Sequence, residues 1–519
     1  MLLYAVAVAA GCLLASRGLI HFFQLESYQF PGYYRTLKRN WKRAVLPGAA
    51  LTLYGLVMSA LGGALTLSFA DLCLALAFVA FGLAFAKAMK KQKAKKALVF
   101  TPRIKRLYAV AAVVFTLVFW GAGAVSQWLM FILPVLLPAL VALAGLLAWP
   151  IEKLISEMYF RDAQRMLKNR PDLIRIGITG SYGKTSVKFI LGTMLQEKYQ
   201  TLITPSSFNT PMGVTKIIRT KLQPAHQVFV AEMGARHVGD IKEMCRLVHP
   251  HHGVLTSVGP QHLDTFKTLE RIKKTKYELM DAIPEGGCCF FPDDGAICRE
   301  LYDRTVKEKR LACVRPSDAD VWAEDITVSP AGSSFLLCTK TDSIRCDTKL
   351  LGEHNIQNIV LAASVCLHLN MTLRQIARGI ARIAPVEHRL QLIPSAGVTI
   401  IDDAFNSNPR GANAALDVIR QFSGRRIIIT PGMVELGTEE ESFNREFGRK
   451  MASCVDVAIL VGRRHTRPIQ EGLKEEGFPE EDLHVTASLE EAAAILRQIG
   501  RAGDVALFEN DLPDNYSEA

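Results

Sequence analysis

The chain has 519 residues, too many for one hydrophobic core, so we expect about three folding units. Its formal net charge of +11 would suit a nucleic-acid-binding protein. Lys and Arg crowd the breaks between apolar runs near the N-terminus, however, and membrane topology explains that placement better than binding to nucleic acid. The 11 cysteines are never spaced C-x-x-C, which argues against a disulfide framework or zinc site. This cysteine usage indicates that the soluble part of the chain lies in a reducing cytosol.

Residues 1–150 are almost continuously apolar and predict a helical membrane region. A bilayer core takes about 20 helical residues. Apolar runs near that length give five candidate spans, near 2–16, 44–66, 69–86, 107–124 and 127–149. A cleaved signal peptide is the alternative for the first run, but no basic segment precedes it and more apolar runs follow.

The basic residues between these runs predict the orientation of the region. Residues 17–43 carry six Lys/Arg and residues 87–106 carry nine, whereas the breaks at 67–71 and 121–127 carry none. Basic loops tend to stay in the cytosol. We therefore expect a multi-pass protein of the cytoplasmic membrane, with the N-terminus outside and the chain after the fifth run in the cytosol.

The first basic break is also rich in aromatic residues. One interpretation is a belt of Tyr and Trp at the membrane interface. The other is a site for a lipid head group or pyrophosphate, with Arg35, Lys38 and Arg39 as partners of the anion. The sequence leaves both open, and either one puts this break in contact with membrane lipid.

From residue 151 the chain has the composition of a soluble α/β protein. Apolar side chains keep helical spacing over 151–167, which predicts an amphipathic connector. An apolar strand at 173–179 is followed by Gly-Ser-Tyr-Gly-Lys-Thr-Ser at 180–186 and then by an amphipathic helix. This order offers free backbone N–H groups, an ammonium and a hydroxyl, which are what a phosphate and its Mg²⁺ require.

The general phosphate-loop spacing needs glycine at position 178, where this chain has Ile178, so a chance glycine-lysine turn is the alternative. The shorter form Thr179-Gly180-x-x-Gly183-Lys184-Thr185, however, resembles the nucleotide loop of the Mur ligases. Further blocks that resemble this family follow in order, over about residues 173–440. They are Glu232-Met233-Gly234-Ala235, Gln261-His262-Leu263-Asp264, Lys276-Tyr277-Glu278, Gly352-Glu353-His354-Asn355 with Asn358, His388-Arg389, Asp402-Asp403-Ala404-Phe405-Asn406-Ser407-Asn408-Pro409 and Gly432-Met433-Val434-Glu435-Leu436-Gly437.

The resemblance implies ATP and Mg²⁺ as cofactors, together with a set of catalytic residues. Lys184 and Thr185 would hold the ATP phosphates and one Mg²⁺, with Glu232 completing that metal's ligands. His262 and Lys276 would serve a second Mg²⁺, with Lys276 carbamylated. The remaining nucleotide contacts that the resemblance implies are Thr179, Gly180, Ser181, Gly183 and Ser186 of the loop, His354, Asn355 and Asn358 beside the adenine, and Arg389, Asp402 and Asn406 from a third domain that closes over ATP.

Some positions depart from the family's pattern. Ser257 stands where the family usually has Asn, and Phe291 where an Asn usually precedes the Asp-Asp pair, which puts one nucleotide contact in doubt. After the last strand this chain is acidic (508–516), where the D-alanyl-D-alanine-adding members, which the last two blocks resemble most, tend to read Lys-Gly-Ser. The apolar region also occupies the place of the family's UDP-binding domain.

The family's activity is the ATP-dependent joining of a carboxylate to an amine through an acyl phosphate, and we expect it here. Anchoring in place of UDP binding suggests a lipid-linked cell-envelope precursor as the acceptor and an amino acid or dipeptide as the amine. The alternative is ordinary D-alanyl-D-alanine addition to a UDP-linked tripeptide in peptidoglycan synthesis. A transport or signalling protein switched by nucleotide is a third possibility, disfavoured because the candidate spans carry no intramembrane charge apart from Asp71 at an interface.

The expected architecture is a membrane α-helical region at 1–150, the connector, and two α/β domains. Residues 168–388 should form a mostly parallel phosphate-loop domain, with a small β insertion within 310–350. Residues 389–519 should form a Rossmann-like domain with strands at 398–402, 426–430, 457–461 and 505–508. The active site should lie between the two α/β domains.

Overall fold

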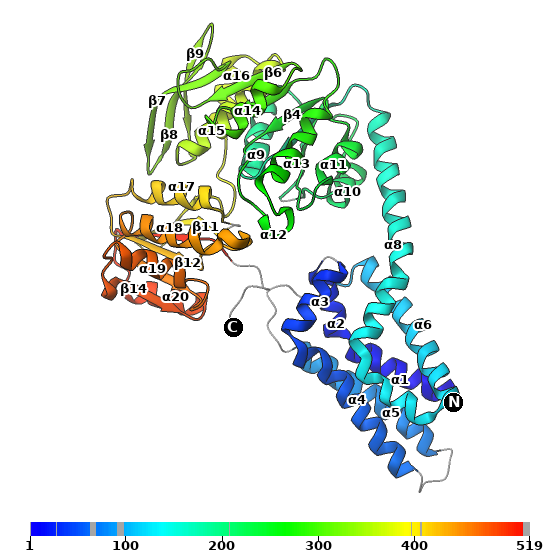
Figure 1. Cartoon of the computed structure of the whole chain (residues 1–519). Coiled ribbons are helices and arrows are strands. Elements are labelled where there is room, and N and C mark those ends of the chain that lie inside the picture. Colours follow the sequence, from blue (N-terminus) through cyan, green and yellow to red (C-terminus); the bar gives the residue numbers. More distant parts are fainter. Residues whose placement is uncertain are drawn as a thin grey trace. The chain divides into compact units, whose positions relative to one another are not determined.

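The computed structural model describes residues 2–26, 28–62, 69–90, 98–206, 208–395, 397–404 and 407–511. The chain divides into two compact units, Met1–Met158 and Tyr159–Ala519 (Figure 1). The first unit is entirely helical over its described residues, and the second consists of two sheets with their helices. This confirms the predicted combination of a helical N-terminal region with an α/β remainder.

The first unit is a bundle of apolar helices. Helices α1 and α5 approach closely at two glycines, because a Cβ added at Gly11 would lie 2.6 Å from the carbonyl oxygen of Phe78, and one at Gly82 would overlap the carbonyl of Gly11. Small residues at such crossings let helix backbones pack without side chains between them. The helices are α1 (Leu2–Ala15), α2 (Arg17–Leu25), α3 (Phe30–Arg39), α4 (Trp41–Gly62), α5 (Phe69–Lys90), α6 (Pro102–Val125), α7 (Gln127–Ile132), the 3-10 turn η1 (Leu133–Leu136) and α8 (Leu137–Lys168).

Two helices among the described residues are long and apolar enough to cross a membrane, Pro102–Val125 and the run Gln127–Lys168. A third candidate is the pair α1 and α2, if the 48° bend between them lies within one span. The predicted run 44–66 extends past residue 62, outside the described residues. The basic break 17–43, predicted only as a loop, is largely helical, since α2 and α3 lie within it.

The predicted connector at 151–167 is helical but does not begin a new helix. It continues α8, which passes through Pro150 without a break. Proline lacks a backbone N–H and usually interrupts a helix, but Pro150 does not end α8. The end of α8, from Tyr159 to Lys168, belongs to the second unit, where Phe160, Ala163 and Leu167 are buried in its core.

The middle domain contains a nine-stranded sheet in the order β2-β3-β1-β4-β5-β6-β7-β8-β9. Neighbouring strands are parallel up to β7, whereas β7, β8 and β9 pair antiparallel. The antiparallel part is the β insertion that was expected within 310–350. The strands are β1 (Ile174–Thr179), β2 (Thr201–Ile203), β3 (Val228–Glu232), β4 (His252–Leu255), β5 (Cys289–Pro292), β6 (Lys309–Cys313), β7 (Val321–Ser329), β8 (Gly332–Thr339) and β9 (Ser343–Thr348).

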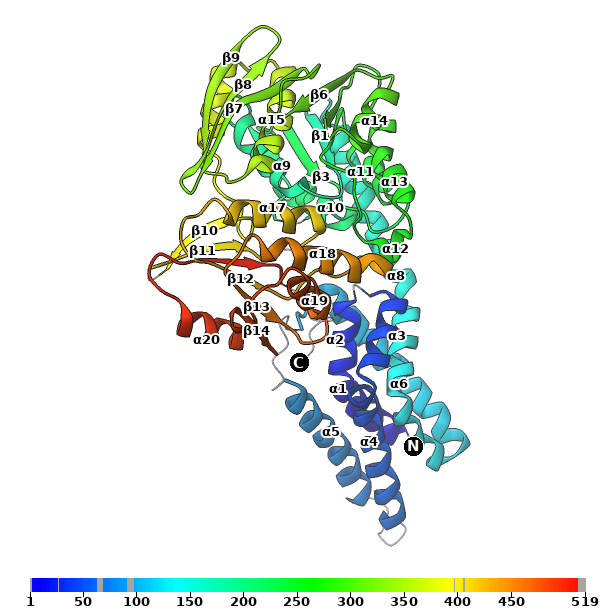
Figure 2. The ribbon, with the colours of Figure 1, turned by 60° about the vertical axis from the view of Figure 1, so that its left-hand side comes forward.

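Helices cover both faces of this sheet, which explains why strand β3 is buried along its whole length. Val228 and Val230 pack on the side of α9, α15 and α16, and Phe229 and Ala231 on the side of α10, α11, α13 and α14 (Figure 2). Alternating side chains of one strand thus enter two separate cores. The helices are α9 (Lys184–Leu195), α10 (Pro211–Lys221), α11 (Asp240–Val248), α12 (Leu263–Phe266), α13 (Leu269–Asp281), α14 (Ile297–Arg304), α15 (Glu353–His368) and α16 (Leu373–Ala381).

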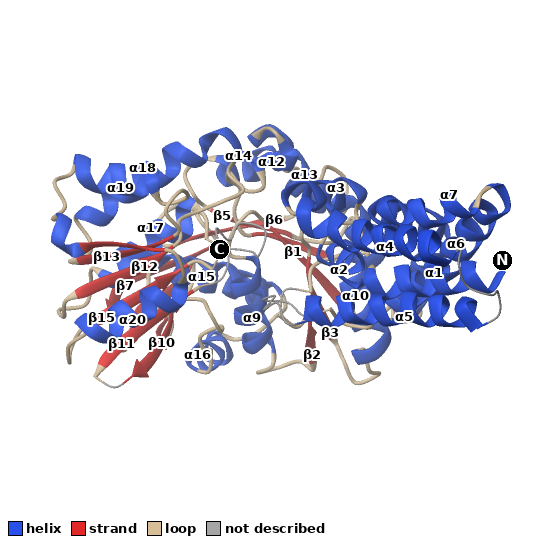
Figure 3. Ribbon diagram, turned by 90° about the horizontal axis from the view of Figure 1, so that it is seen from below, coloured by secondary structure: helices blue, strands red, loops and turns tan. Residues whose placement is uncertain are grey.

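The C-terminal domain has a six-stranded sheet in the order β10-β11-β15-β12-β13-β14, flanked by helices (Figure 3). The pair β10 and β11 is antiparallel and the other pairs are parallel. The four predicted strands correspond to β11, β12, β13 and β15, while β10 and β14 were not predicted. The elements are β10 (Gln391–Ser395), β11 (Val398–Asp403), α17 (Pro409–Ile419), β12 (Arg426–Thr430), η2 (Gly437–Glu439), α18 (Glu440–Ala452), β13 (Val457–Val461), α19 (Arg467–Glu475), η3 (Glu480–Asp482), β14 (Leu483–Thr486), α20 (Leu489–Ile499) and β15 (Val505–Glu509).

Candidate active site

The glycine-rich loop connects the carboxyl end of β1 to the first turn of α9. Gly180 and Gly183 have φ angles of 155° and 77°, in the region that favours glycine. A Cβ at Gly180 would overlap the side chain of Thr256, and one at Gly183 would lie 3.0 Å from Oδ1 of Asn358. Both glycines therefore serve the turn, and the second begins a helix whose free N–H groups can face an anion.

A neighbouring loop holds the glycine-rich loop in shape. The backbone N–H of Ser181 donates to the carbonyl of Ser257 (2.8 Å), and that of Tyr182 donates to Ser257 Oγ (2.7 Å). Ser181 Oγ donates to the carbonyl of Gly259 (2.9 Å). Ser257, a departure from the family's pattern, thus stabilises the loop through hydrogen bonds to its backbone. The hydrogen bond from the Ser181 hydroxyl to Gly259 also stabilises it.

The predicted phosphate-binding lysine lies over its own loop. Lys184 Nζ donates to the carbonyls of Gly180 (2.7 Å) and Ser181 (2.9 Å). Burial lowers the pKa of Lys184 to about 8, although the carboxylate of Glu232 favours its charged form. Of the other loop residues, Thr179 donates to the carbonyl of Met233 (3.0 Å) and so ties β1 to β3, while Ser186 lies in the first turn of α9.

Glu232, at the end of β3, is the centre of a buried polar cluster. Its carboxylate accepts from Thr185 Oγ1 (3.0 and 3.2 Å), Lys188 Nζ (2.9 Å) and Asn209 Nδ2 (3.0 Å). Burial would raise the pKa of Glu232, but the ammonium groups of Lys188 and Lys184 outweigh it and hold the pKa below its ordinary value. A hydroxyl and an ionised carboxylate beside a phosphate loop are hard oxygen ligands, which suits Mg²⁺.

Lys188 and Asn209 were not predicted as part of this cluster. Lys188 is one helical turn after Lys184, on the same face of α9, and its side chain is completely buried. That spacing was the available signal in the sequence. Asn209 lies in the loop before α10 and had none.

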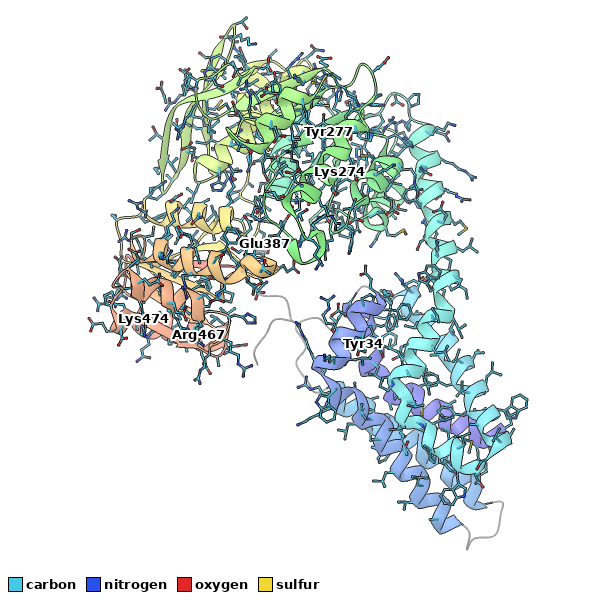
Figure 4. The ribbon with its side chains drawn as sticks, in the orientation of Figure 1. Tyr34, Lys274, Tyr277, Glu387, Arg467 and Lys474 are labelled. Carbon is cyan, nitrogen blue, oxygen red and sulfur yellow. The ribbon has the colours of Figure 1, made fainter. Side chains whose placement is uncertain are left out.

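Lys276 lies on α13 with only 1% of its surface exposed, whereas Lys274 on the same helix is exposed (Figure 4). Burial and the charge of Lys184 lower the pKa of Lys276 well below its ordinary value, and the carboxylates of Asp240, Glu278 and Glu232 oppose this only in part. Among the described residues no hydrogen bond or ion pair is found for its ammonium. Burial of this kind favours the neutral amine over the ammonium.

The C-terminal domain contributes the side chains of Glu435 and Arg389 near the loop. Nδ1 of His262 lies 2.6 Å from Oε2 of Glu435, a residue that the sequence placed in a motif but not in the site. Burial lowers the pKa of Arg389, while Asp403 and Glu232 favour its charged form. Arg389 therefore lies within electrostatic range of groups from both domains.

Of the other predicted nucleotide contacts, some lie against the loop and others have partners elsewhere. Asn358 lies against Gly183, whereas Asn355 donates to the carbonyl of Leu351 (2.8 Å) within its own helix. Burial lowers the pKa of His354 to about 4, so its imidazole is neutral. Asp402 accepts from Nδ1 of His388 (2.7 Å), and Asn406 lies outside the described residues.

Two carboxyl groups lie at the ends of adjacent strands in the C-terminal sheet. Burial raises the pKa of Asp403 and of Glu509 to about 7 in each case, and the nearness of Glu509 adds to the effect on Asp403. Glu509 accepts hydrogen bonds from Ser407 and from Thr430 Oγ1 (2.6 Å). Of the pair, only Glu509 belongs to the acidic segment 508–516 that the sequence showed, and it is the last residue of β15.

These features define a phosphate-loop α/β protein in which a second α/β domain supplies charged groups to the loop. A family model described as the Mur ligase middle domain matches residues 178–366, and one described as Mur ligase, glutamate ligase domain, matches residues 388–509. The UDP-N-acetylmuramoyl-tripeptide–D-alanyl-D-alanine ligase of Escherichia coli (strain K12) is 30% identical over 293 residues, covering 56% of this chain and 64% of that protein.

The ligase of the same name from Mycobacterium bovis is 30% identical over 359 residues, covering 64% of this chain and 69% of that protein. The crystal structure of MurF from Acinetobacter baumannii matches with a TM-score of 0.63 and 26% identity, over 69% of this chain and 77% of that one. The chain belongs to the Mur ligase family, as its motifs predicted. It spans 64–69% of the length of these two curated relatives.

Proposed function

We propose that this chain is a membrane-anchored, ATP-dependent ligase that joins an amine to a carboxylate of a cell-envelope precursor through an acyl phosphate. The observation that carries the proposal is the convergence of Lys184, Thr185 and Glu232 of the middle domain with Arg389 and Glu435 of the C-terminal domain. A phosphate loop alone would serve any nucleotide-binding protein. The charged residues of a second domain beside it are what a transfer reaction between bound substrates requires.

In this proposal the loop N–H groups and Lys184 hold the phosphates of ATP. Thr185 and Glu232 would hold Mg²⁺, and the donor set fits, because a hydroxyl and a carboxylate already converge within 3.0–3.2 Å. When bound, Mg²⁺ would neutralise charge on the phosphate oxygens. Lys188 keeps Glu232 ionised, so that no proton has to leave before a cation can bind.

The reaction then needs little covalent chemistry from the protein. An oxygen of the acceptor carboxylate attacks the γ-phosphorus, a P–O bond forms, and the bond to ADP breaks. The amine then attacks the acyl carbon, loses a proton, and phosphate leaves as the amide forms. Lys184 and Arg389 would stabilise the negative charge that develops during both steps.

We further propose His262 and Lys276 for a second Mg²⁺. Lys276 would be carbamylated: burial favours the neutral form of its amine, which would attack CO₂, lose a proton and become an anionic oxygen ligand. The adenine would lie beside Asn358 and His354, and Asn355 would support them through its contact with Leu351. Asp402 and Asn406 remain proposed contacts from the C-terminal domain.

For the acceptor we propose a lipid-linked precursor. Two helices suited to crossing a membrane support this, and both carry exposed apolar side chains, including Val113 and Leu117 on α6 and Leu146 and Leu147 on α8. Trp120 and Trp149 are also exposed, as aromatic residues near membrane interfaces commonly are. We propose that the chain crosses the membrane five times, with the N-terminus outside and the catalytic domains in the cytosol.

A second candidate acceptor is UDP-linked muramoyl tripeptide, with D-alanyl-D-alanine as the amine. The names of the curated relatives favour it. In that case the apolar region would only localise the enzyme. The chain's match to these relatives lies in the two domains that would handle ATP and the amine, so the choice of acceptor depends on the remaining part.

The deciding experiment is phosphate release from ATP by the detergent-purified full chain. Soluble UDP-linked and lipid-linked tripeptides are compared side by side, each with D-alanyl-D-alanine or single amino acids, and products are read by mass spectrometry. Release that needs an acceptor, disappears in Lys184→Ala and gives a product heavier by the amine minus water would support the ligase. Preference for the soluble acceptor would overturn the lipid-linked proposal, and release without any ligated product would favour a nucleotide switch.

A further inference from the structure

A hydrogen bond joins the middle and C-terminal domains close to the phosphate loop. Nδ1 of His262 lies 2.6 Å from Oε2 of Glu435. The imidazole comes from the segment after β4 and the carboxylate from the segment after β12. Their side chains are 15% and 24% exposed, so water has little access to either partner.

Both residues of this contact have an unusual backbone conformation. His262 has a φ of 52° and Glu435 a φ of 65°, a conformation that residues with a Cβ seldom adopt. Such backbone persists where the surrounding structure enforces it, and it is concentrated at functional sites. The meeting of two such residues from different domains indicates that their geometry is imposed rather than accidental.

The segment that carries Glu435 is fixed within its own domain. Asn444 of α18 accepts from the N–H of Met433 and donates to its carbonyl, both at 2.9 Å. Met433 and Leu436 are each 2% exposed and belong to the core of the C-terminal domain. Glu435 must therefore move with that domain as a whole, and its contact with His262 exists only while the two domains are together.

The carboxylate also decides which nitrogen of the imidazole is available. An ionised carboxylate only accepts hydrogen bonds, so Nδ1 of His262 carries the hydrogen and Nε2 keeps its lone pair. Histidines that bind metals are commonly oriented by a carboxylate in this way. We infer that Glu435 is a positioning residue that makes His262 a competent metal ligand only when the C-terminal domain lies against the middle domain.

This inference rests on the proposed function, because it takes His262 as a ligand of the second cation. Its consequence is that cation binding and domain docking are coupled. By linkage, the cation must favour the docked arrangement to the same extent that docking favours the cation. Neither effect would be expected if Glu435 served only to stabilise its own domain.

The test uses Mn²⁺ as a probe for the Mg²⁺ sites, since it accepts similar oxygen and imidazole ligands. Binding of Mn²⁺ to the full chain in the presence of ADP is measured by electron paramagnetic resonance for the wild type, Glu435→Ala and Glu435→Gln. Glu439→Ala is the matched control, because Glu439 is an exposed carboxylate in the adjoining turn η2. We expect two Mn²⁺ ions per wild-type chain and a loss of about 10–100-fold in the affinity of one of them in Glu435→Ala.

The affinity for the other Mn²⁺ ion and for ADP should stay at the wild-type value. Glu435→Gln keeps an acceptor oxygen, so its affinity for the weakened Mn²⁺ should fall between those of the wild type and Glu435→Ala. A second measurement follows docking with spin labels at Lys274→Cys and Lys474→Cys, two exposed sites on α13 and α19 (Figure 4). Addition of Mg²⁺ and ADP should narrow the distribution of distances in the wild type and not in Glu435→Ala.

Two tight Mn²⁺ ions in both Glu435→Ala and the control would overturn the inference and leave the ligase proposal intact. A wild-type chain that binds ADP with only one Mn²⁺ would overturn the inference together with the second metal site. A chain that binds neither ADP nor Mn²⁺ would instead overturn the proposed function itself.

Discussion

The ammonium nitrogen of Lys188 lies 2.9 Å from Oε2 of Glu232, and neither side chain exposes more than 1% of its surface. Removing one partner of such a pair leaves a buried charge without compensation. We expect Lys188→Met to lower the free energy of unfolding by about 3–5 kcal/mol. Lys216→Met, at an exposed position on α10, should change it by less than about 0.5 kcal/mol.

Urea unfolding followed by circular dichroism measures both variants. The double variant Lys188→Met with Glu232→Gln removes both charges and should recover part of the lost stability, because no unpaired charge remains. If the double variant is no more stable than Lys188→Met alone, the pair is not coupled as the structure indicates.

Gly183→Ala should weaken nucleotide binding at the start of α9. The φ of Gly183 is 77°, and an added Cβ would lie 3.0 Å from Oδ1 of Asn358. Gly286, with a φ of 80° and no atom within 4 Å of an added Cβ, provides the control. Both substitutions should cost about 1–2 kcal/mol through the left-handed backbone.

Only Gly183→Ala should reduce the affinity for ATP. We expect a reduction of tenfold or more, and tenfold corresponds to about 1.4 kcal/mol of binding free energy. Isothermal titration calorimetry of ATP binding separates the two effects. Equal ATP affinity in the two variants would mean that the shape of this turn does not matter for the nucleotide.

Glu509 should make the protein less stable as the pH rises. Its folded-state pKa is raised to about 7 by burial, whereas an unfolded glutamate titrates near about 4.3. The folded state therefore binds the proton more tightly. The resulting stabilisation is fully present below about pH 4 and is lost as the pH rises through about 7.

Glu509→Gln should raise the unfolding free energy at pH 8 by roughly 1–3 kcal/mol and flatten its dependence between pH 5 and 8. The glutamine can still accept from Ser407 or Thr430. Glu439→Gln, at an exposed site, should leave the pH profile unchanged. A steeper decline in Glu509→Gln than in the wild type would contradict the assignment.

Lys276 should react with CO₂. Burial and the charge of Lys184 lower the pKa of its amine well below the ordinary value, which favours the neutral, nucleophilic form. With ¹³C-labelled bicarbonate, nuclear magnetic resonance should show a carbamate carbon in the wild type and in Lys274→Arg, and none in Lys276→Arg. A carbamate signal that persists in Lys276→Arg would place the modification elsewhere.

The sequence predicted those parts of the fold in which local pattern and tertiary role agree. The strand, glycine turn and helix over 173–195 correspond to β1, the loop and α9. Strand β10 was missed because it contains Pro394, which lacks the N–H that a central strand needs but is accepted at a sheet edge. Strand β14 is a four-residue edge strand, too short to stand out.

The site residues divide in the same way. Lys184 and Thr185 were recognisable because the motif that contains them is contiguous in the chain. Lys188 looks like any lysine on an amphipathic helix until β3 brings Glu232 against it. Glu435 lies in a motif, but its partner His262 is 173 residues away in the sequence, and only the arrangement of the two α/β domains brings them together.

The continuity of helix α8 has a practical consequence for preparing the catalytic half alone. The division between the units falls at Met158, inside a helix that runs from Leu137 to Lys168, so no surface loop there offers a protease a place to cut. A recombinant fragment must keep Phe160, Ala163 and Leu167, which fill its core. Every additional turn retained upstream adds exposed apolar side chains, Met158 and Leu154 among them, and with them a tendency to self-associate.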